Sequence, residues 1–189
     1  MAIPVLKDCT MTRPRKARRT KTLDVEMIDE TKLRFELGLE DKGFSDVGEE
    51  PIHSLEIFGE ISVPDLEILS IEAKAILQPY DLCRASIAPV SKLVGARIGP
   101  GFRARVLEAM GRTAGCTHFL TMLLDLTAAH TLSVFLRISQ RTRYADRNSP
   151  DPDWTRVGLD IEPQLVNACI ALGADSPIIQ KAKEKSGKS

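Results

Sequence analysis

The chain is poor in aromatic side chains and has no long hydrophobic run. Phe, Trp and Tyr make up 5% of its 189 residues, which argues against a stacking platform for a large planar cofactor. No stretch of about 18 uncharged apolar residues marks a membrane-spanning helix. The opening MAIPVLKDCTMTRPRKARR lacks the apolar segment and the small-residue cleavage site of a signal peptide. We therefore expect a cytoplasmic protein without membrane contact.

Cysteine is also scarce and widely spaced. The four cysteines are Cys9, Cys83, Cys116 and Cys169. Their spacing is typical of reduced thiols rather than of a disulfide framework. A chain of this length buries roughly 70% of its unfolded surface, so it needs no crosslinks to fold as one soluble domain.

The chain has no net charge, yet its charges are segregated. Residues 1–22 carry seven bases and one acid, residues 23–72 fifteen acids and three bases, and residues 73–147 eleven bases and four acids. This order indicates two layers that attract each other, or solvated faces. The basic arm TRPRKARRTK lacks aromatic residues and a recognition-helix pattern, so nucleic acid is not the expected partner. A polyanion-binding adaptor stays open as an alternative.

A period-two alternation of apolar and polar residues predicts four strands in the first half. It covers residues 23–27, 33–39, 55–63 and 69–75. Turn residues follow at Asp29-Glu30 and Pro64-Asp65. We expect a mainly antiparallel sheet with one acidic, solvent-facing side. The charged segment 41–50 is expected as a loop between the two hairpins.

The second half has helical periodicity. Residues 81–94 predict a helix capped by Asp81 and interrupted at Pro89, residues 102–110 a second helix, and residues 117–140 a long buried one. Segment 141–163 is expected as a loop, followed by a short helix at 164–172. The fold class is therefore α+β, with an antiparallel sheet of about four strands packed against three or four helices. We expect a partly disordered basic arm at 1–19, a single domain at 20–175 and a solvated tail at 176–189.

Counting chain reversals brings reactive residues to one end of this fold. If the second hairpin turns near residue 64, His53 lies opposite about residue 75, where the sheet leads into the first helix. Two short helices that run away and back return the chain to that level near residue 116. The residues expected to gather there are His53, Tyr80, Cys83, Arg84, Cys116 and His118.

Such a set supports three kinds of chemistry. Cys116 opens a helix with His118 in the same turn, the pairing that a nucleophilic cysteine needs. Alternatively, His53 and His118 act as acid and base, with Arg84 or Arg97 binding a substrate carboxylate. The third option is a zinc ion held by Cys and His ligands, although Cys-x-His is not a standard structural-zinc spacing.

Two further features bear on the site. Asp125 lies two turns after His118 on an apolar helix, so it either pairs with an arginine or faces a cavity. The glycine-rich GARIGPG at 95–101 lacks the Lys-Ser/Thr of a phosphate-binding loop and does not follow a strand. No nucleotide cofactor is therefore expected.

Several short motifs resemble a known family. The basic stretch RPRKARRTKTLDVEM is followed by PIHSLEI, QPYDLC, KLVGARIGPGF and GCTHFLTMLL. This order is similar to the bacterial DUF2889 family of uncharacterised proteins, over roughly residues 12–140. The resemblance implies no established reaction. It places on family motif positions His53, Tyr80, Cys83, Cys116 and His118.

The leading hypothesis is a small cytoplasmic enzyme. It would act on a small anionic organic acid, aromatic or not, by histidine acid–base chemistry of the lyase, decarboxylase or isomerase type. The expected catalytic residues are His118, His53, Cys116 and Tyr80, and the expected substrate-binding residues are Arg84, Arg97, Cys83 and Asp125. The alternatives are a zinc-stabilised interaction module and a polyanion-binding adaptor. The long apolar helix offers a face for a homodimer.

Overall fold

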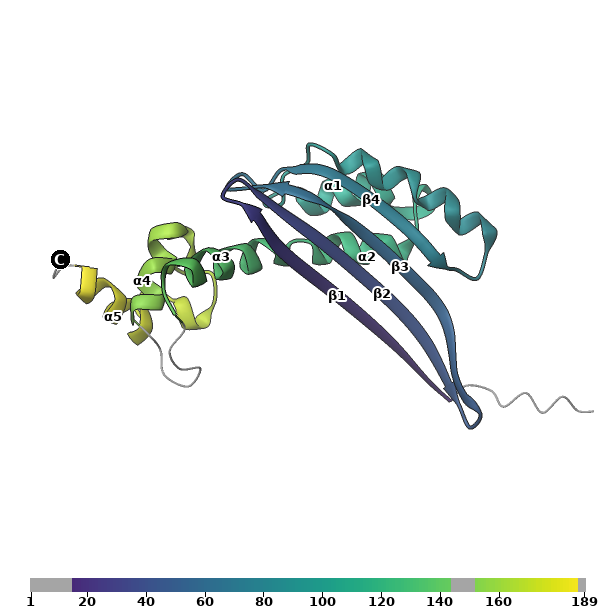
Figure 1. The fold of residues 1–189 in the computed structure, drawn as a ribbon, viewed down its shortest axis with the longest axis horizontal. Coiled ribbons are helices and arrows are strands. Elements are labelled where there is room, and N and C mark those ends of the chain that lie inside the picture. Colours follow the sequence, from purple (N-terminus) through teal and green to yellow (C-terminus); the bar gives the residue numbers. More distant parts are fainter. Residues whose placement is uncertain (1–14, 144–151, 187–189) are drawn as a thin grey trace, which may run out of the picture.

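The first half of the protein folds as one four-stranded antiparallel sheet (Figure 1). The computed structural model describes residues 15–143 and 152–186. The strands lie in sequence order: β1 Lys16–Asp29, β2 Lys32–Ser45, β3 Gly48–Ser62 and β4 Ile68–Leu77. The predicted α+β class and the four-stranded antiparallel sheet are therefore confirmed. Of the basic arm, residues 16–19 belong to β1, and residues 1–14 lie outside the described residues.

The central hairpin is longer than expected. Strands β2 and β3 pair from Lys32 opposite Ser62 to Ser45 opposite Gly48, so segment 41–50 is not a loop between hairpins. The alternation of β2 continues through it, because Leu37, Leu39 and Asp41 are all buried on one face. The charged residues of this strand end made it resemble a loop in the sequence. Backbone hydrogen bonds, rather than apolar side chains, hold the end of the strand. The hairpin end projects beyond the helices in Figure 1.

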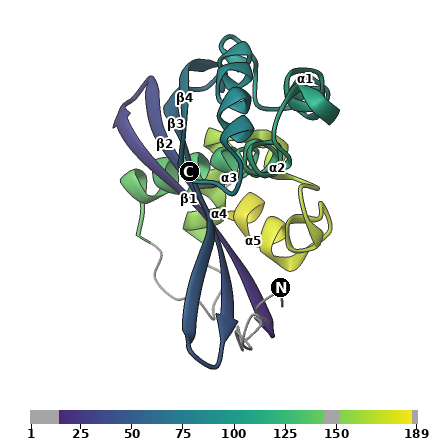
Figure 2. The ribbon, with the colours of Figure 1, turned by 90° about the vertical axis from the view of Figure 1, so that its right-hand side faces the viewer.

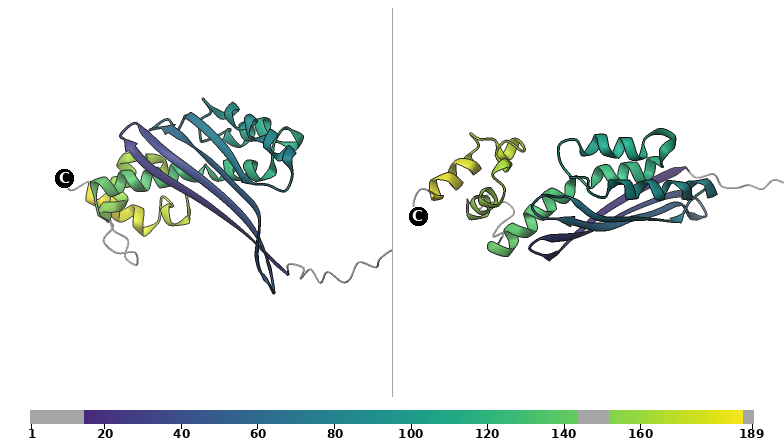
Figure 3. Two further views of the ribbon diagram at one scale, coloured as in Figure 1. Left: turned by 45° about the vertical axis from the view of Figure 1, so that its right-hand side comes forward. Right: turned by 90° about the horizontal axis from the view of Figure 1, so that it is seen from above.

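Helices cover one face of the sheet, as the view from above shows (Figure 3). After β4, two 3₁₀ helices replace the first expected helix: η1 Asp81–Ser86, capped at Tyr80 rather than Asp81, and η2 Ala88–Leu93. They separate beside Pro89, whose missing N–H interrupts helical hydrogen bonding. Helix α1 Phe102–Met110, the turn η3 Arg112–Ala114 and helix α2 Thr117–Asp125 follow. The main core lies between these elements and the sheet.

The long apolar helix is broken into two. Helix α2 ends at Asp125, and α3 spans Ala128–Arg141. At the break, the Thr127 hydroxyl donates to the Leu124 carbonyl oxygen at 2.9 Å, a bond that competes with regular helical pairing. The stretch Thr117–Arg141 is long and apolar enough to cross a membrane by length and composition alone. Its first half packs into the main core, where Phe119, Met122 and Leu123 are fully buried.

Two segments expected to be irregular are helical. Helix α4, Pro152–Ile161, lies within the expected loop, and α5, Pro177–Ser186, lies in the expected solvated tail. The turns η4 Pro163–Leu165 and η5 Ile170–Leu172 replace the expected helix at 164–172. In α5, Ile179 and Ala182 are fully buried and lie at helical spacing. The lysines around them made the sequence of this segment resemble a solvent-exposed tail. Figures 1 and 3 show α4 and α5 at the far end of α3, beyond the sheet, and Figure 2 views the molecule from the opposite end.

Close packing of β3 against β4 generates a stability prediction. A Cβ at Gly59 would overlap the backbone carbonyl oxygen of Ser70, whereas a Cβ at Gly99 would meet no atom within 4 Å. We expect Gly59→Ala to lower the free energy of unfolding by about 1–3 kcal/mol. Gly99→Ala should change it by less than about 0.5 kcal/mol. Urea unfolding of both variants measures the difference, and equal stabilities would contradict the strand pairing described.

Candidate functional site

Three neighbouring strands contribute one row of polar side chains to the helix-covered face of the sheet. Arg19 on β1 pairs in register with Asp41 on β2, and Asp41 pairs with His53 on β3. Residues directly opposite each other in antiparallel strands project to the same side. The register shifts after this pair, because Lys42 pairs with Pro51 and leaves Ile52 of β3 as an extra residue. On β2, Asp41 adds a carboxylate to the buried face that Leu37 and Leu39 form.

The carboxylate of Asp41 is hydrogen-bonded on both oxygens. Arg19 donates from Nε to Oδ1 and from Nη2 to Oδ2, both at 2.7 Å, in a bidentate pair. His53 Nδ1 lies 3.0 Å from Oδ2. An ionised carboxylate only accepts, so Nδ1 carries the proton in this contact and Nε2 keeps its lone pair.

The local charges keep Asp41 ionised. The bidentate hydrogen bonds and charge of Arg19 hold the pKa of the Asp41 carboxyl below its usual range, against the opposing effect of burial. His118 and His53 act in the same direction as Arg19. The hydrogen bonds to Asp41 in turn raise the pKa of the Arg19 guanidinium. A charged carboxylate, 12% exposed in its side chain, is thus available to orient nearby imidazoles.

The first turn of α2 brings a cysteine and a second imidazole to this row. Cys116 is the N-cap of α2, and its Sγ accepts the His118 backbone N–H at 3.4 Å. The His118 ring lies between two partners, with Nδ1 3.3 Å from Cys116 Sγ and Nε2 3.5 Å from Asp41 Oδ2. The rings of His53 and His118 stack at a centroid distance of 4.0 Å and a tilt of 38°. The two imidazoles therefore share one carboxylate.

The surroundings favour the neutral form of His118. Burial is the main cause that lowers its pKa from 6.5, and the positive charges of His53 and Arg19 add to the effect. The charge of Asp41 opposes it without reversing it. At neutral pH the His118 imidazole is uncharged and able to accept a proton.

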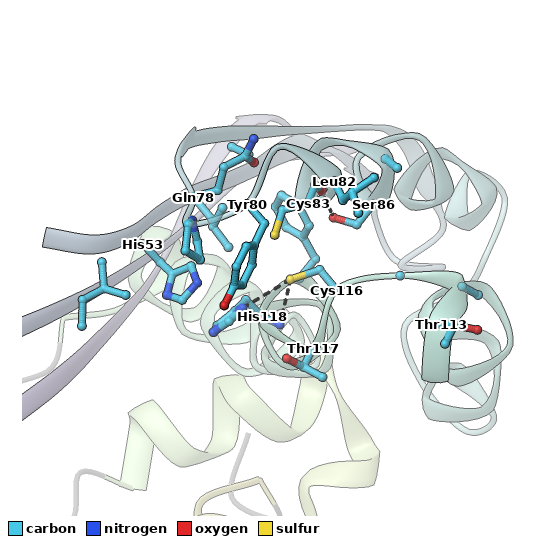
Figure 4. A pocket seen from close by; sticks show the side chains of 18 residues that line it. His53, Gln78, Tyr80, Leu82, Cys83, Ser86, Thr113, Cys116, Thr117 and His118 are labelled. Carbon is cyan, nitrogen blue, oxygen red and sulfur yellow. Dashed lines mark hydrogen bonds between the residues drawn. The ribbon is translucent and has the colours of Figure 1, made fainter. Parts of the chain in front are cut away.

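The imidazoles and the Cys116 thiol line one cavity of about 810 Å³ (Figure 4). Its walls come from β3, the end of β4, η1 and the start of α2, and no Lys, Arg, Asp or Glu is among its lining residues in the described parts of the chain. Figure 4 shows the Tyr80 hydroxyl directed toward the imidazoles. The predicted residues that line it are His53, Tyr80, Cys83, Cys116 and His118.

Three expected substrate-binding residues lie elsewhere. Arg84 is exposed on η1 and does not line the cavity. Arg97 lies within 4.0 Å of Asp65 and Glu67, near the start of β4, whereas the cavity lies near its end. Asp125, the last residue of α2, forms an ion pair with Lys21 of β1. The arginine anchor expected from the sequence is thus not part of this cavity.

The reversal count overlooked two residues of the site, Arg19 and Asp41. Both lie on strand ends that the sequence interpretation assigned to the basic arm and to a loop. A signal for Asp41 was present, since it follows Leu37 and Leu39 at the spacing of two residues that keeps a strand position on one face. A carboxylate at a core-facing position needs a partner, and Arg19 supplies it.

The same side chains include a set able to hold a metal ion. Ligand atoms of Asp41, His53 and His118 all lie within 4.8 Å of one another, and two imidazoles with one carboxylate suit zinc or iron(II). No such set among the described residues includes Cys83 or Cys116. The Arg19 guanidinium already occupies both Asp41 oxygens and opposes a further cation.

The lowered pKa of His118 predicts a pH-dependent stability. The unfolded chain takes up this proton near pH 6.5 and the folded chain only at lower pH, so folding is disfavoured as the pH falls through 6.5. We expect the free energy of unfolding of the wild type, relative to His118→Asn, to decrease between pH 8 and pH 5. Unfolding curves at each pH measure it, and an NMR titration of His118 with its midpoint above 6.5 would contradict it.

Comparison with known proteins yields one match. A protein family described as "Protein of unknown function (DUF2889)" matches residues 7–132. Searches of curated proteins and of solved structures found no match. The matched range includes the Arg19, Asp41, His53, Cys116 and His118 network and every residue that lines the cavity. Because the match covers more than half of the chain, the protein belongs to the DUF2889 family.

Proposed function

We propose that this protein is an enzyme that performs histidine acid–base chemistry on a small organic acid with an apolar or aromatic body. One observation carries the proposal. Two imidazoles share the buried, arginine-bound carboxylate of Asp41 at the wall of a cavity that is otherwise lined by uncharged residues. A histidine with a lowered pKa, such as His118, beside a largely apolar cavity is the arrangement expected of a catalytic site.

His53 is the proposed general base. Its Nδ1–H donates to Asp41 at 3.0 Å, which leaves the Nε2 lone pair for a substrate proton. The carboxylate stabilises the imidazolium that forms when the proton arrives. Arg19 keeps the carboxylate oriented through two hydrogen bonds, so the ring has a fixed direction before substrate binds.

His118 is the proposed partner in proton transfer. The ring centroids of the two histidines are 4.0 Å apart, so positive charge on both rings at once is disfavoured. When His53 becomes charged, His118 therefore stays neutral and exchanges a proton at another substrate atom. Two adjacent imidazoles in different protonation states are suited to removing a proton from one position and returning it to another.

The cavity constrains the substrate. Its volume of about 810 Å³ lies within the usual range for small-molecule sites. No arginine or lysine among the described residues lines it, so the substrate carboxylate would be bound by neutral donors such as Tyr80 and Thr117. Decarboxylation, carbon–carbon cleavage and isomerisation all fit, and none needs a nucleotide cofactor. The free thiols of Cys83 and Cys116 are consistent with a cytoplasmic location.

The two non-catalytic alternatives have weaker support. A zinc-stabilised module would draw on Cys83 and Cys116, which belong to no metal-binding set in the described parts of the chain. A polyanion-binding adaptor would draw on the basic arm, of which Lys16 and Arg18 lie over the ring of Phe44. The carboxylate shared by two histidines involves neither these cysteines nor the part of the arm over Phe44.

Hydrogen–deuterium exchange at carbon tests the proposal. We expect the protein in D₂O to accelerate proton exchange, or loss of CO₂, for at least one of phenylpyruvate, phenylmalonate and cinnamate above the buffer rate. His53→Gln and Asp41→Asn should reduce this rate by a factor of about 100 or more, because they remove the base or its orienting carboxylate. Proton NMR of the substrate measures the rate directly.

His130→Gln is the matched control, because His130 pairs with Glu162 on the C-terminal helices, away from the cavity. This variant should keep the wild-type rate. No acceleration for any of the three compounds, or a rate that survives His53→Gln, would contradict the proposed function.

A further inference from the structure

We infer that Cys116 is a nucleophile that bonds covalently to a soft, electrophilic carbon of the substrate, with His118 as the base that accepts its proton. This inference rests on the proposed function for its cavity and reaction class. It adds a covalent step to that proposal, and a chemical probe tests it without a known substrate.

The position of the sulfur supports the inference first. Cys116 Sγ is the N-cap atom of α2, a helix of nine residues, and it accepts the first-turn N–H of His118 at 3.4 Å. Negative charge on an atom at this position is stabilised by the helix N-terminus and its N–H groups. The Cys116 sulfur therefore lies at the end of α2 whose dipole attracts negative charge.

The base beside the sulfur is the second support. His118 Nδ1 lies 3.3 Å from Sγ, within reach of the thiol proton. The opposite ring nitrogen, Nε2, lies 3.5 Å from the Asp41 carboxylate, which stabilises the imidazolium once the proton has moved. The His118 ring thus lies between the proposed nucleophile, Cys116, on its Nδ1 side and the orienting carboxylate of Asp41 on its Nε2 side. The neutral state of His118, favoured by burial, agrees with its role as the acceptor.

The remaining thiols of the described chain lack this environment. Cys83 lines the same cavity, yet the hydrogen bonds at this residue involve its backbone N–H and carbonyl oxygen. Cys169 is exposed on the C-terminal part. Figure 4 shows the Cys116 sulfur directed toward His118, beside the Tyr80 ring. Cys83 and Cys169 therefore serve as internal controls for cavity access and for plain exposure.

The chemistry points to an alkene conjugated to a carbonyl group. The thiol proton moves to His118 Nδ1, the Cys116 Sγ bonds to the substrate carbon β to the carbonyl, and the alkene π pair moves onto the carbonyl to give an enolate. Rotation about the former double bond follows. Collapse of the enolate then breaks the bond between sulfur and the substrate, restores the alkene and returns the proton from His118 to sulfur. The step needs no oxidant, reductant or second substrate, and it matches the isomerase class among the reactions proposed above.

Labelling with N-phenylmaleimide, an aromatic conjugated alkene that fits an apolar cavity, tests the inference. With limiting reagent and peptide mass mapping, we expect Cys116 to be modified about tenfold or more faster than Cys169 and Cys83. His118→Asn and His118→Phe should slow Cys116 labelling by about tenfold or more. In both variants the Cys169 rate should be unchanged, and circular dichroism checks that they fold.

Two results would overturn the inference. One is Cys116 labelling no faster than that of Cys83 or Cys169, which would indicate access without activation. The other is a Cys116 rate that persists in a folded His118 variant. Labelling requires no turnover, so the two experiments are independent. Slow labelling of Cys116 together with catalysed carbon exchange would contradict only the covalent step. Rapid labelling of Cys116 without catalysed carbon exchange would contradict only the proposed acid–base role.

Discussion

The bidentate pair between Arg19 and Asp41 is the interaction on which the site depends. It holds a carboxylate in its charged form at a core-facing position, where an unpaired charge would be strongly disfavoured. That one carboxylate contacts His53 at 3.0 Å and lies 3.5 Å from His118. The two rings stack against each other, and the second ring reaches Cys116. Removing Asp41 would leave the imidazoles without the group that orients them, and removing Arg19 would leave that carboxylate without its bidentate partner.

The fold provides this network through strand register. Because Arg19 of β1 pairs with Asp41 of β2 and Asp41 pairs with His53 of β3, the three polar residues lie side by side across the sheet. Helix α2 begins above the same row, so its N-terminal turn adds a sulfur and an imidazole to a surface already fixed by backbone hydrogen bonds. The last residues of β4 and the following 3₁₀ helix close the cavity on the other side. Reactive groups built on strands and a helix end, rather than on long loops, are held in one geometry.

Part of this architecture could be predicted from the sequence. Alternation identified the four strands, and reversal counting brought His53, Cys116 and His118 to one end. The network was not predicted because Arg19 and Asp41 lie on strand ends made of charged residues. These ends are held by backbone pairing and lack the apolar alternation by which strands are recognised in a sequence. Reversal counting also brought Arg84 to this end, and Arg97 was a candidate by its charge. Arg84 is exposed and does not line the cavity, and Arg97 lies near Asp65 and Glu67 at the other end of β4. Helices α4 and α5 were missed because each buries only a narrow stripe, such as Ile179 and Ala182.

The central claim is that Asp41 fixes the proton of His53 on Nδ1 and leaves Nε2 free as a base. Long-range proton–nitrogen NMR of the imidazole side chains at pH 8 tests this claim most directly. The account predicts that neutral His53 carries its proton on Nδ1 in the wild type and loses this preference in Asp41→Asn. A proton on Nε2 of His53 in the wild type, or a tautomer unaffected by Asp41→Asn, would contradict it.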